Sequence, residues 1–162
     1  MKRFAALLPL ALCVAGSAEA EGLIATHRIS AALANEAVGA AVASCAKSGY
    51  AETAVLVDTD GVTQAALRGD GAGIHTLDSA HDKAYTSVTF KTDTGALVER
   101  AKSSPVSVLT AKLPHLLLFQ GGVVIKLGNE VLGAIGAAGA PGGQLDDGCA
   151  KAGLDTIMAG LK

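Results

Sequence analysis

Two short turn sequences, Asp60-Gly61 and Gly128-Asn129, constrain the fold of this chain more than any other feature. Each turn lies between two runs rich in β-branched and other apolar residues, as the turn of a β-hairpin does. The four runs are Thr53 to Val57, Val62 to Leu67, Val123 to Ile125 and Val131 to Ala138. Because hairpins pair their strands antiparallel, the turns argue against a doubly wound parallel sheet.

Helical spacing surrounds and separates the two hairpins. Apolar residues recur three or four positions apart in three segments of the chain, which is typical of helices with one buried face. The predicted helices run from Leu23 to Lys47, from Thr76 or Asp78 to Phe90 with a shorter continuation to Ala101, and from Leu145 to Leu161. Pro105 and Pro114 bracket an irregular connector. This order predicts a single α+β domain with helices on the faces of an antiparallel sheet.

The first 20 residues have the parts of a signal peptide. Lys2 and Arg3 precede an apolar stretch, and Ala18-Glu19-Ala20 offers a cleavage site of small residues. We therefore expect a leader at residues 1–20 and a periplasmic or secreted domain at residues 21–162. No later segment has the length of apolar chain that a membrane span needs. Cys13 follows the bulky Leu12, which argues against a lipid anchor.

Composition narrows the function of the mature chain. The full chain has a formal net charge of −2, and removal of the predicted leader changes it little, so there is no electrostatic reason to bind nucleic acid or an anionic membrane. Aromatic residues make up only 3% of the chain, and Trp is absent, so the stacking residues of single-strand binders are missing. With 50% hydrophobic residues, the core must consist mainly of Ala, Val, Leu and Ile.

Two cysteines, Cys45 and Cys149, remain after the predicted leader. An even number of cysteines in an exported chain predicts a disulfide, here between the first and last helices. The alternative is that both are separate buried thiols that pack as small apolar residues.

The histidines are the candidate ligands for iron. His75 is the first choice because it follows the run Gly69 to Gly73, which allows a backbone to approach a flat ligand closely. His27, expected at the start of a helix, is the second choice. His81 stands next to Asp82 and Lys83, which favours a solvated helix face, and His115 lies beside Pro114 in the connector.

Motifs for other chemistries are weak or missing. No two histidines have the spacing of a zinc motif. The chain also lacks the Gly-x-Ser-x-Gly elbow of serine hydrolases and the lysine of a phosphate-binding loop. Asp146 and Asp147 could bind a hard cation, but the start of a helix explains them more simply. For Arg68, an ion pair with Asp70 that holds the loop is a simpler role than catalysis.

Three separated motifs resemble the GlcG/HbpS-like family, which also includes the C-terminal domain of PduO-type proteins. They are Leu67-Arg68-Gly69-Asp70-Gly71-Ala72-Gly73; Thr76-Leu77-Asp78-Ser79-Ala80 with Lys83-Ala84-Tyr85-Thr86; and Gly121-Gly122, Val131-Leu132-Gly133-Ala134-Ile135-Gly136 and Gly139-Ala140. The resemblance implies a profilin-like fold, with a five-stranded antiparallel sheet between helical layers, often in a homo-oligomer. It also implies a link to haem, through binding, degradation or sensing.

Three functions follow from these observations. The first is an exported haem-binding protein for scavenging, transfer or sensing, in which His75 or His27 holds the iron and Arg68 or Lys83 pairs with a propionate. The second is an oligomeric accessory module that binds another exported protein without a cofactor. The third is a weak haem-degrading enzyme, for which no catalytic acid, base or nucleophile is evident.

Overall fold

The computed structural model describes residues 22–104, 109–110 and 112–161. The predicted leader at residues 1–20 and Pro105 lie outside these ranges. The elements are α1 (Ala31–Lys47), β1 (Thr53–Val57), β2 (Thr63–Arg68), α2 (Thr76–Phe90), α3 (Thr94–Ala101), β3 (Gly122–Leu127), β4 (Glu130–Ala138), α5 (Gly143–Ile157) and the 3-10 helix η1 (Met158–Gly160). The predicted α+β class is confirmed. Within the described part of the chain, no helix has the length and apolar character needed to cross a membrane.

Both predicted hairpins are present and share one antiparallel sheet with the strand order β2-β1-β4-β3. The central pair β1 and β4 joins the hairpins, with Leu56 opposite Ile135. The implied fifth strand is wrong for this chain, because the described residues form four strands. The connector before β3 does not supply another, since the Leu117 N–H donates to the Thr86 hydroxyl and the Phe119 N–H to the Leu117 carbonyl.

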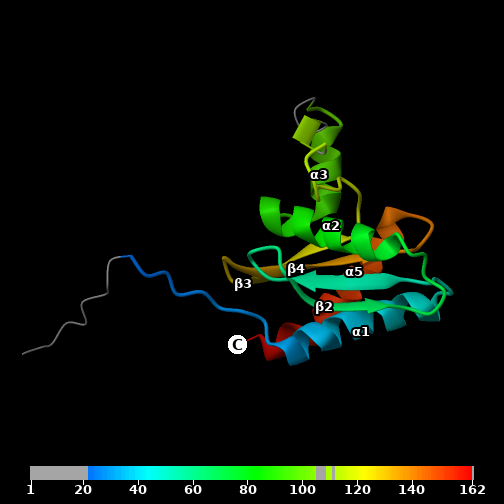
Figure 1. Cartoon of the computed structure of the whole chain (residues 1–162), viewed down its shortest axis with the longest axis horizontal. Helices are drawn as coiled ribbons and strands as arrows, with labels where there is room; N and C mark the ends of the chain where they lie inside the picture. The colour runs from blue at the N-terminus through cyan, green and yellow to red at the C-terminus, as the bar shows by residue number, and fades with distance from the viewer. Residues whose placement is uncertain (1–21, 105–108, 111, 162) are drawn as a thin grey trace, which may run out of the picture.

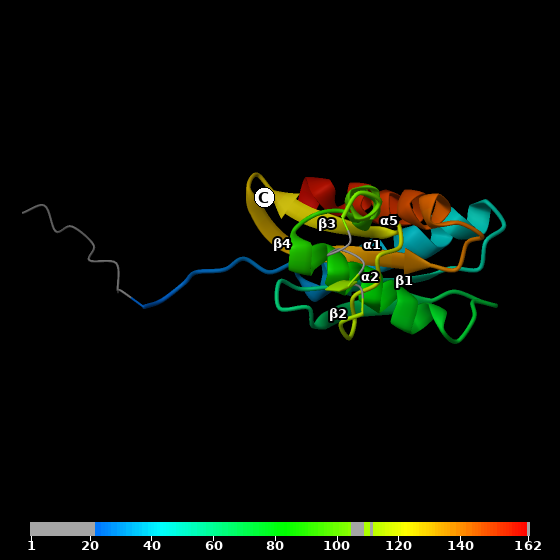
Figure 2. The same cartoon turned by 90° about the horizontal axis from the view of Figure 1, so that it is seen from above.

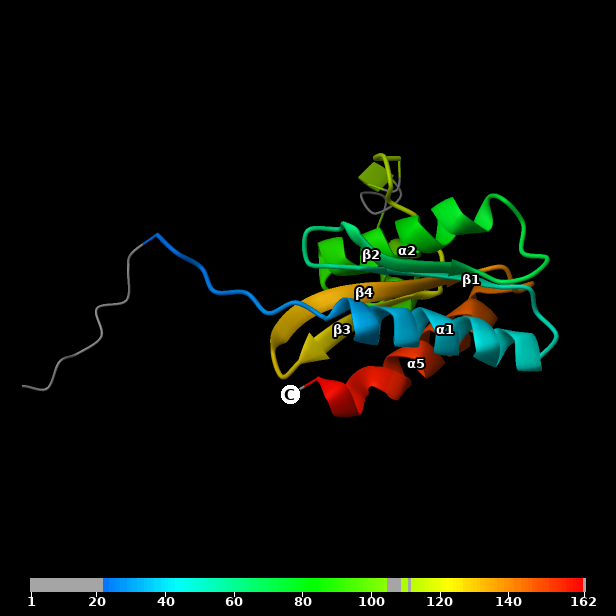
Figure 3. The same cartoon turned by 60° about the horizontal axis from the view of Figure 1, so that its bottom comes forward.

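The sheet lies between two helical layers (Figures 1 and 3). Helices α1 and α5 cover one face, where Val38 of α1 and Ile157 of α5 join Leu56 and Ile135 in the larger hydrophobic cluster. Helix α2 covers the other face through Ala80, Ala84 and Val88. Seen from above, α2 lies in front of the strands, and α1 and α5 lie on their far side (Figure 2). Strand β1 is buried along its whole length because both faces are covered.

Small residues allow the layers to approach closely. A Cβ atom at Gly136 of β4 would collide with the Ala80 carbonyl of α2. Where α1 and α5 cross, a Cβ atom at Gly153 would lie 2.5 Å from the Ala37 carbonyl oxygen. The core is therefore built from short side chains at close backbone distances, which agrees with the low aromatic content.

Helix α1 begins eight residues later than predicted. Its first residue is Ala31, because the Ser30 hydroxyl accepts the Leu33 N–H and caps the helix. Residues 23–30 are extended, and the apolar Leu23 and Ile24 are exposed. The prediction that His27 starts a helix is therefore wrong, and His27 lies in this extended segment.

Candidate functional site

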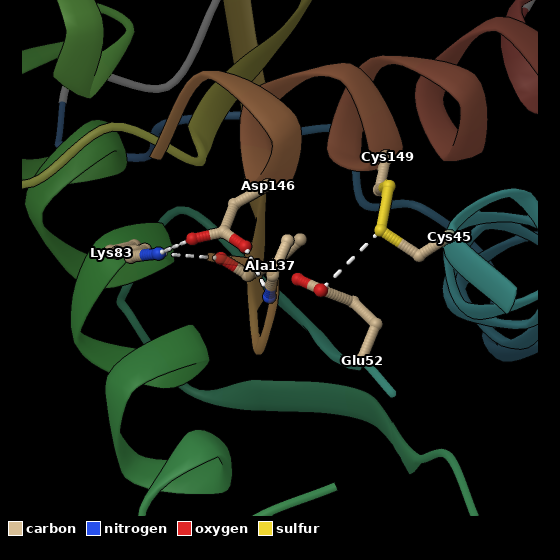
Figure 4. Close-up of a disulfide and its surroundings, with 7 residues drawn as sticks. Cys45, Glu52, Lys83, Ala137, Asp146 and Cys149 are labelled. Carbon is tan, nitrogen blue, oxygen red and sulfur yellow. Dashed lines mark hydrogen bonds and ion pairs between the residues drawn. A yellow bond between two sulfur atoms is a disulfide. The ribbon is translucent and has the colours of Figure 1, made fainter. Parts of the chain in front are cut away.

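The predicted disulfide is confirmed. Cys45 on α1 and Cys149 on α5 are bonded, with their Cα atoms 5.6 Å apart (Figure 4). Both residues are buried between the two helices. The bond therefore ties the first helix of the domain to the last across 104 residues.

A buried ion pair joins α2 to α5. Lys83 Nζ lies 2.6 Å from Asp146 Oδ2 and donates to the Ala137 carbonyl at 2.8 Å (Figure 4). Asp146 Oδ1 accepts the Ala140 N–H at 3.0 Å. The prediction of a solvated helix face is wrong for Lys83, whose side chain is only 3% exposed. Such burial is tolerated because each charge meets its opposite and further hydrogen bonds.

Glu52 extends this buried polar group toward the disulfide. It is only 1% exposed, and its Oε2 lies 3.4 Å from Cys45 Sγ (Figure 4). Burial, together with the negative charge of Asp146, raises the pKa of Glu52 to about 8, and Lys83 opposes both effects. Glu52 is therefore mainly protonated at neutral pH, so this buried cluster of Glu52, Lys83 and Asp146 holds one lysine charge against one aspartate charge.

A pocket of about 380 Å³ opens beside the glycine-rich loop. His75 stands at its rim, at the N-terminus of α2, and Lys83 and Asp146 reach it from the buried ion pair. Phe119 lines the same pocket and lies under the Lys83 ammonium, 5.1 Å from ring centroid to Nζ. A Cβ atom at Gly73 would lie 2.9 Å from His75 Cε1, so a side chain there would displace the exposed imidazole. The structure thus brings together two of the four predicted ligand-binding residues, His75 and Lys83.

Arg68 belongs to a different surface. Its Nε donates to the Ala72 carbonyl at 2.9 Å, so it holds the glycine-rich loop through a backbone oxygen instead of through the predicted pairing with Asp70. Arg68 lines a separate pocket with Tyr50 and Glu52.

His27 lines a pocket that contains neither His75 nor Lys83. Its Nδ1 lies 2.9 Å from Glu130 Oε2, and its backbone N–H donates to Glu130 Oε1 at 3.3 Å. The hydrogen bond from His27 lowers the pKa of Glu130 below its ordinary value. The pocket beside it has a volume of about 370 Å³. Arg28 and Ser30 line it together with the apolar residues Ile29, Leu33, Leu127, Leu132 and Leu161.

The pairing of His27 with Glu130 has a clear chemical meaning. A carboxylate on one ring nitrogen fixes the orientation of an imidazole and leaves the other nitrogen, Nε2, to bind a metal. Sequence reasoning missed Glu130, because the two residues are 103 positions apart and meet only when the β3–β4 turn returns to the start of α1.

Comparisons with known proteins agree with this architecture. The family model described as "Haem degrading protein HbpS-like" matches residues 29–155. A double mutant of HbpS from Streptomyces reticuli is similar, with 34% identity, a TM-score of 0.80, and coverage of 92% of this chain and 99% of that one. ORFY of Klebsiella pneumoniae has 22% identity, a TM-score of 0.79, and coverage of 88% and 99%.

A complex of PduOC with haem is also similar, with 21% identity, a TM-score of 0.73, and coverage of 82% of this chain and 96% of that one. At this identity the likeness of PduOC, like that of ORFY, concerns the fold alone. No curated protein matches the chain.

Proposed function

Because this chain belongs to the HbpS-like family of haem-degrading proteins, we propose that it binds haem, with the iron held by His27. The observation that carries this proposal is the His27–Glu130 pair beside a leucine-rich pocket. Neutral imidazole is a common axial ligand of haem iron, and the apolar lining suits the face of the macrocycle.

His27 has an advantage over His75, which the sequence ranks first. Among the described residues, none of the hydrogen bonds involves the His75 imidazole, whereas Glu130 holds the His27 ring at Nδ1. Carboxylate partners of this kind orient a ligating histidine and increase its basicity. The pocket at His75 is the second location for haem, with Lys83 among its lining residues to meet a propionate.

The relatives support a haem ligand in general terms. The family description names haem degradation, and PduOC has been solved as a complex with haem. The Cys45–Cys149 disulfide supports export, since such bonds persist in oxidising compartments. Periplasmic or secreted localisation, removal of residues 1–20, the profilin-like assignment and assembly into a homo-oligomer stay predictions.

A haemin titration of residues 21–162, followed at the Soret band, tests the proposal. We expect saturable binding of one haem per chain, and a loss of roughly tenfold or more in affinity for His27→Ala, because the iron would lose its axial ligand. His75→Ala is the matched control and should bind as the unaltered chain does. Glu130→Gln should weaken binding by a smaller factor, because it keeps the shape of the partner but removes its charge.

Each result assigns the site differently. Loss in His75→Ala alone would move haem to the glycine-loop pocket. Binding that never saturates would favour the accessory module, which a tightly associated, colourless oligomer in size-exclusion chromatography would then support. Loss of the Soret band with reductant and oxygen, dependent on folded protein, would add the degrading activity that the family description names.

A further inference from the structure

We propose that His81, Asp82 and His115 form a binding site for one divalent transition-metal ion, separate from both pockets considered for haem. Asp82 Oδ1 lies 3.1 Å from His81 Nδ1 and 3.2 Å from His115 Nδ1. Each of the three residues offers one donor atom, and these three atoms all lie within 4.8 Å of one another. The three side chains therefore converge on one point at the surface of α2.

The separations suit a metal centre. Ligand atoms at about 2.0–2.1 Å from a tetrahedral ion lie roughly 3.3 Å from one another. Both distances to Asp82 Oδ1 are close to this value. A modest turn of His115, whose side chain is 63% exposed, would bring the two imidazole nitrogens to the same spacing.

The Thr86 side chain and the local backbone conformation hold His115 in place against α2. The Thr86 hydroxyl donates to the Asp82 carbonyl at 2.6 Å and accepts the Leu117 N–H at 2.8 Å. This side chain therefore fastens the connector to α2 two residues after His115. His115 itself has a φ of 63°, a left-handed conformation that few residues other than glycine adopt. The surrounding contacts maintain this conformation and direct the imidazole toward Asp82.

Tyr85 completes the packing around the cluster. Its ring centroid lies 6.0 Å from that of His81 and 6.0 Å from that of His115. The same ring packs against Gly61 in the β1–β2 turn, where a Cβ atom would lie 2.6 Å from Tyr85 Cδ2. The Tyr85 ring therefore lies next to both imidazoles.

The donor set defines the class of metal. Two imidazole nitrogens and one carboxylate oxygen suit Zn²⁺, Co²⁺, Ni²⁺ or Cu²⁺, whereas Ca²⁺ and Mg²⁺ prefer oxygen donors alone. The side chains of His81 and Asp82 are 27% and 28% exposed, so solvent reaches the centre. Three protein ligands leave at least one position for water or another small ligand.

Titration of haem-free protein with Co²⁺ tests this site, because four-coordinate Co²⁺ absorbs strongly in the visible range. We expect saturation at one Co²⁺ per chain, followed by loss of the bands when Zn²⁺ is added. Asp82→Asn, His81→Ala and His115→Asn should each weaken binding by roughly tenfold or more. Asparagine is chosen at position 115 because it tolerates the left-handed backbone.

Asp78→Asn provides the matched control. It removes the same charge from α2 one turn before Asp82 but leaves the cluster intact. The proposal is overturned if Co²⁺ binding does not saturate at one equivalent, or if Asp78→Asn lowers the affinity as much as Asp82→Asn does. The three residues would then form only a hydrogen-bonded surface cluster.

Discussion

At the scale of single residues, the protonation of Glu52 sets the balance of buried charge. Its carboxyl group lies between the Lys83–Asp146 pair and the disulfide, and one of its oxygens, Oε1, has no hydrogen-bond partner among the described residues (Figure 4). An ionised Glu52 would place a second negative charge beside Asp146 with one lysine to offset both. The proton on Glu52 avoids that repulsion, which explains the direction of its pKa shift.

Glu52→Gln should therefore change how stability depends on pH. In the unaltered chain the pKa of Glu52 is about 8 when folded and near its ordinary 4.5 when unfolded, so the folded state binds more protons between these values. The contribution of Glu52 is fully present below pH 4.5 and is lost as pH rises toward 8, by up to about 1.4 kcal/mol per pH unit. Glutamine does not titrate and removes this loss.

Chemical denaturation at pH 5, 6.5 and 8 checks this prediction. The free energy of unfolding of Glu52→Gln should rise relative to that of the unaltered protein across the series. A constant difference at all three pH values would contradict a raised pKa at Glu52.

Only some residues of the candidate sites could be predicted from the sequence. Cys45 and Cys149 were predictable because they are the two cysteines that follow the predicted leader, and two cysteines have one simple pairing. The partner of Lys83 was not, since Asp146 is 63 positions away and nothing local to Lys83 indicates it. His81 and His115 have the same difficulty, because 33 residues separate Asp82 from His115 and only the folded connector brings them together.

At the scale of elements, turn sequences and helical spacing predicted most of the architecture. Asp60-Gly61 and Gly128-Asn129 fixed both hairpins because their backbone requirements are local. The start of α1 was placed too early, since Leu23 and Ile24 continue an apolar pattern that the Ser30 cap interrupts. The expected fifth strand came from the family resemblance and not from a pattern in this chain. The described connector forms a hydrogen bond with α2, whereas a fifth strand would have to pair with a neighbouring strand.

The packing of α2 on the sheet depends on Gly136 in β4. A methyl group there would meet the backbone of Ala80, which cannot move without shifting the whole helix. Gly136→Ala should therefore destabilise the domain by roughly 3 kcal/mol, as overpacking of a close contact does. Urea unfolding followed by circular dichroism measures the change.

Gly148→Ala is the control for this substitution. Gly148 lies in α5 with nothing within 4 Å of its added Cβ atom, so alanine should stabilise the helix by about 0.5–1 kcal/mol. If both alanine variants shifted stability in the same direction, close packing of α2 on β4 would not be the determining factor.

At the scale of the whole molecule, the two ends of the domain are held together on one face of the sheet. Helices α1 and α5 pack side by side, and their shared core includes Ala37, Ala41 and Gly153 (Figure 3). Side chains this small give each contact little buried apolar area, and hydrophobic stabilisation scales with that area. The disulfide supplements this contact, because it limits the conformations that the unfolded chain can adopt over 104 residues.

Loss of the disulfide should consequently lower the stability of the entire domain. For Cys45→Ala with Cys149→Ala, we expect a decrease of about 2–5 kcal/mol in the free energy of unfolding, in one cooperative transition. Reduction of the unaltered protein with dithiothreitol separates the contribution of the covalent bond from that of side-chain packing, since it breaks the bond but keeps both sulfur atoms in the core. A similar decrease on reduction would assign the effect to the covalent link between α1 and α5. An unchanged unfolding midpoint after complete reduction, verified by thiol titration, would instead mean that packing alone holds these helices together.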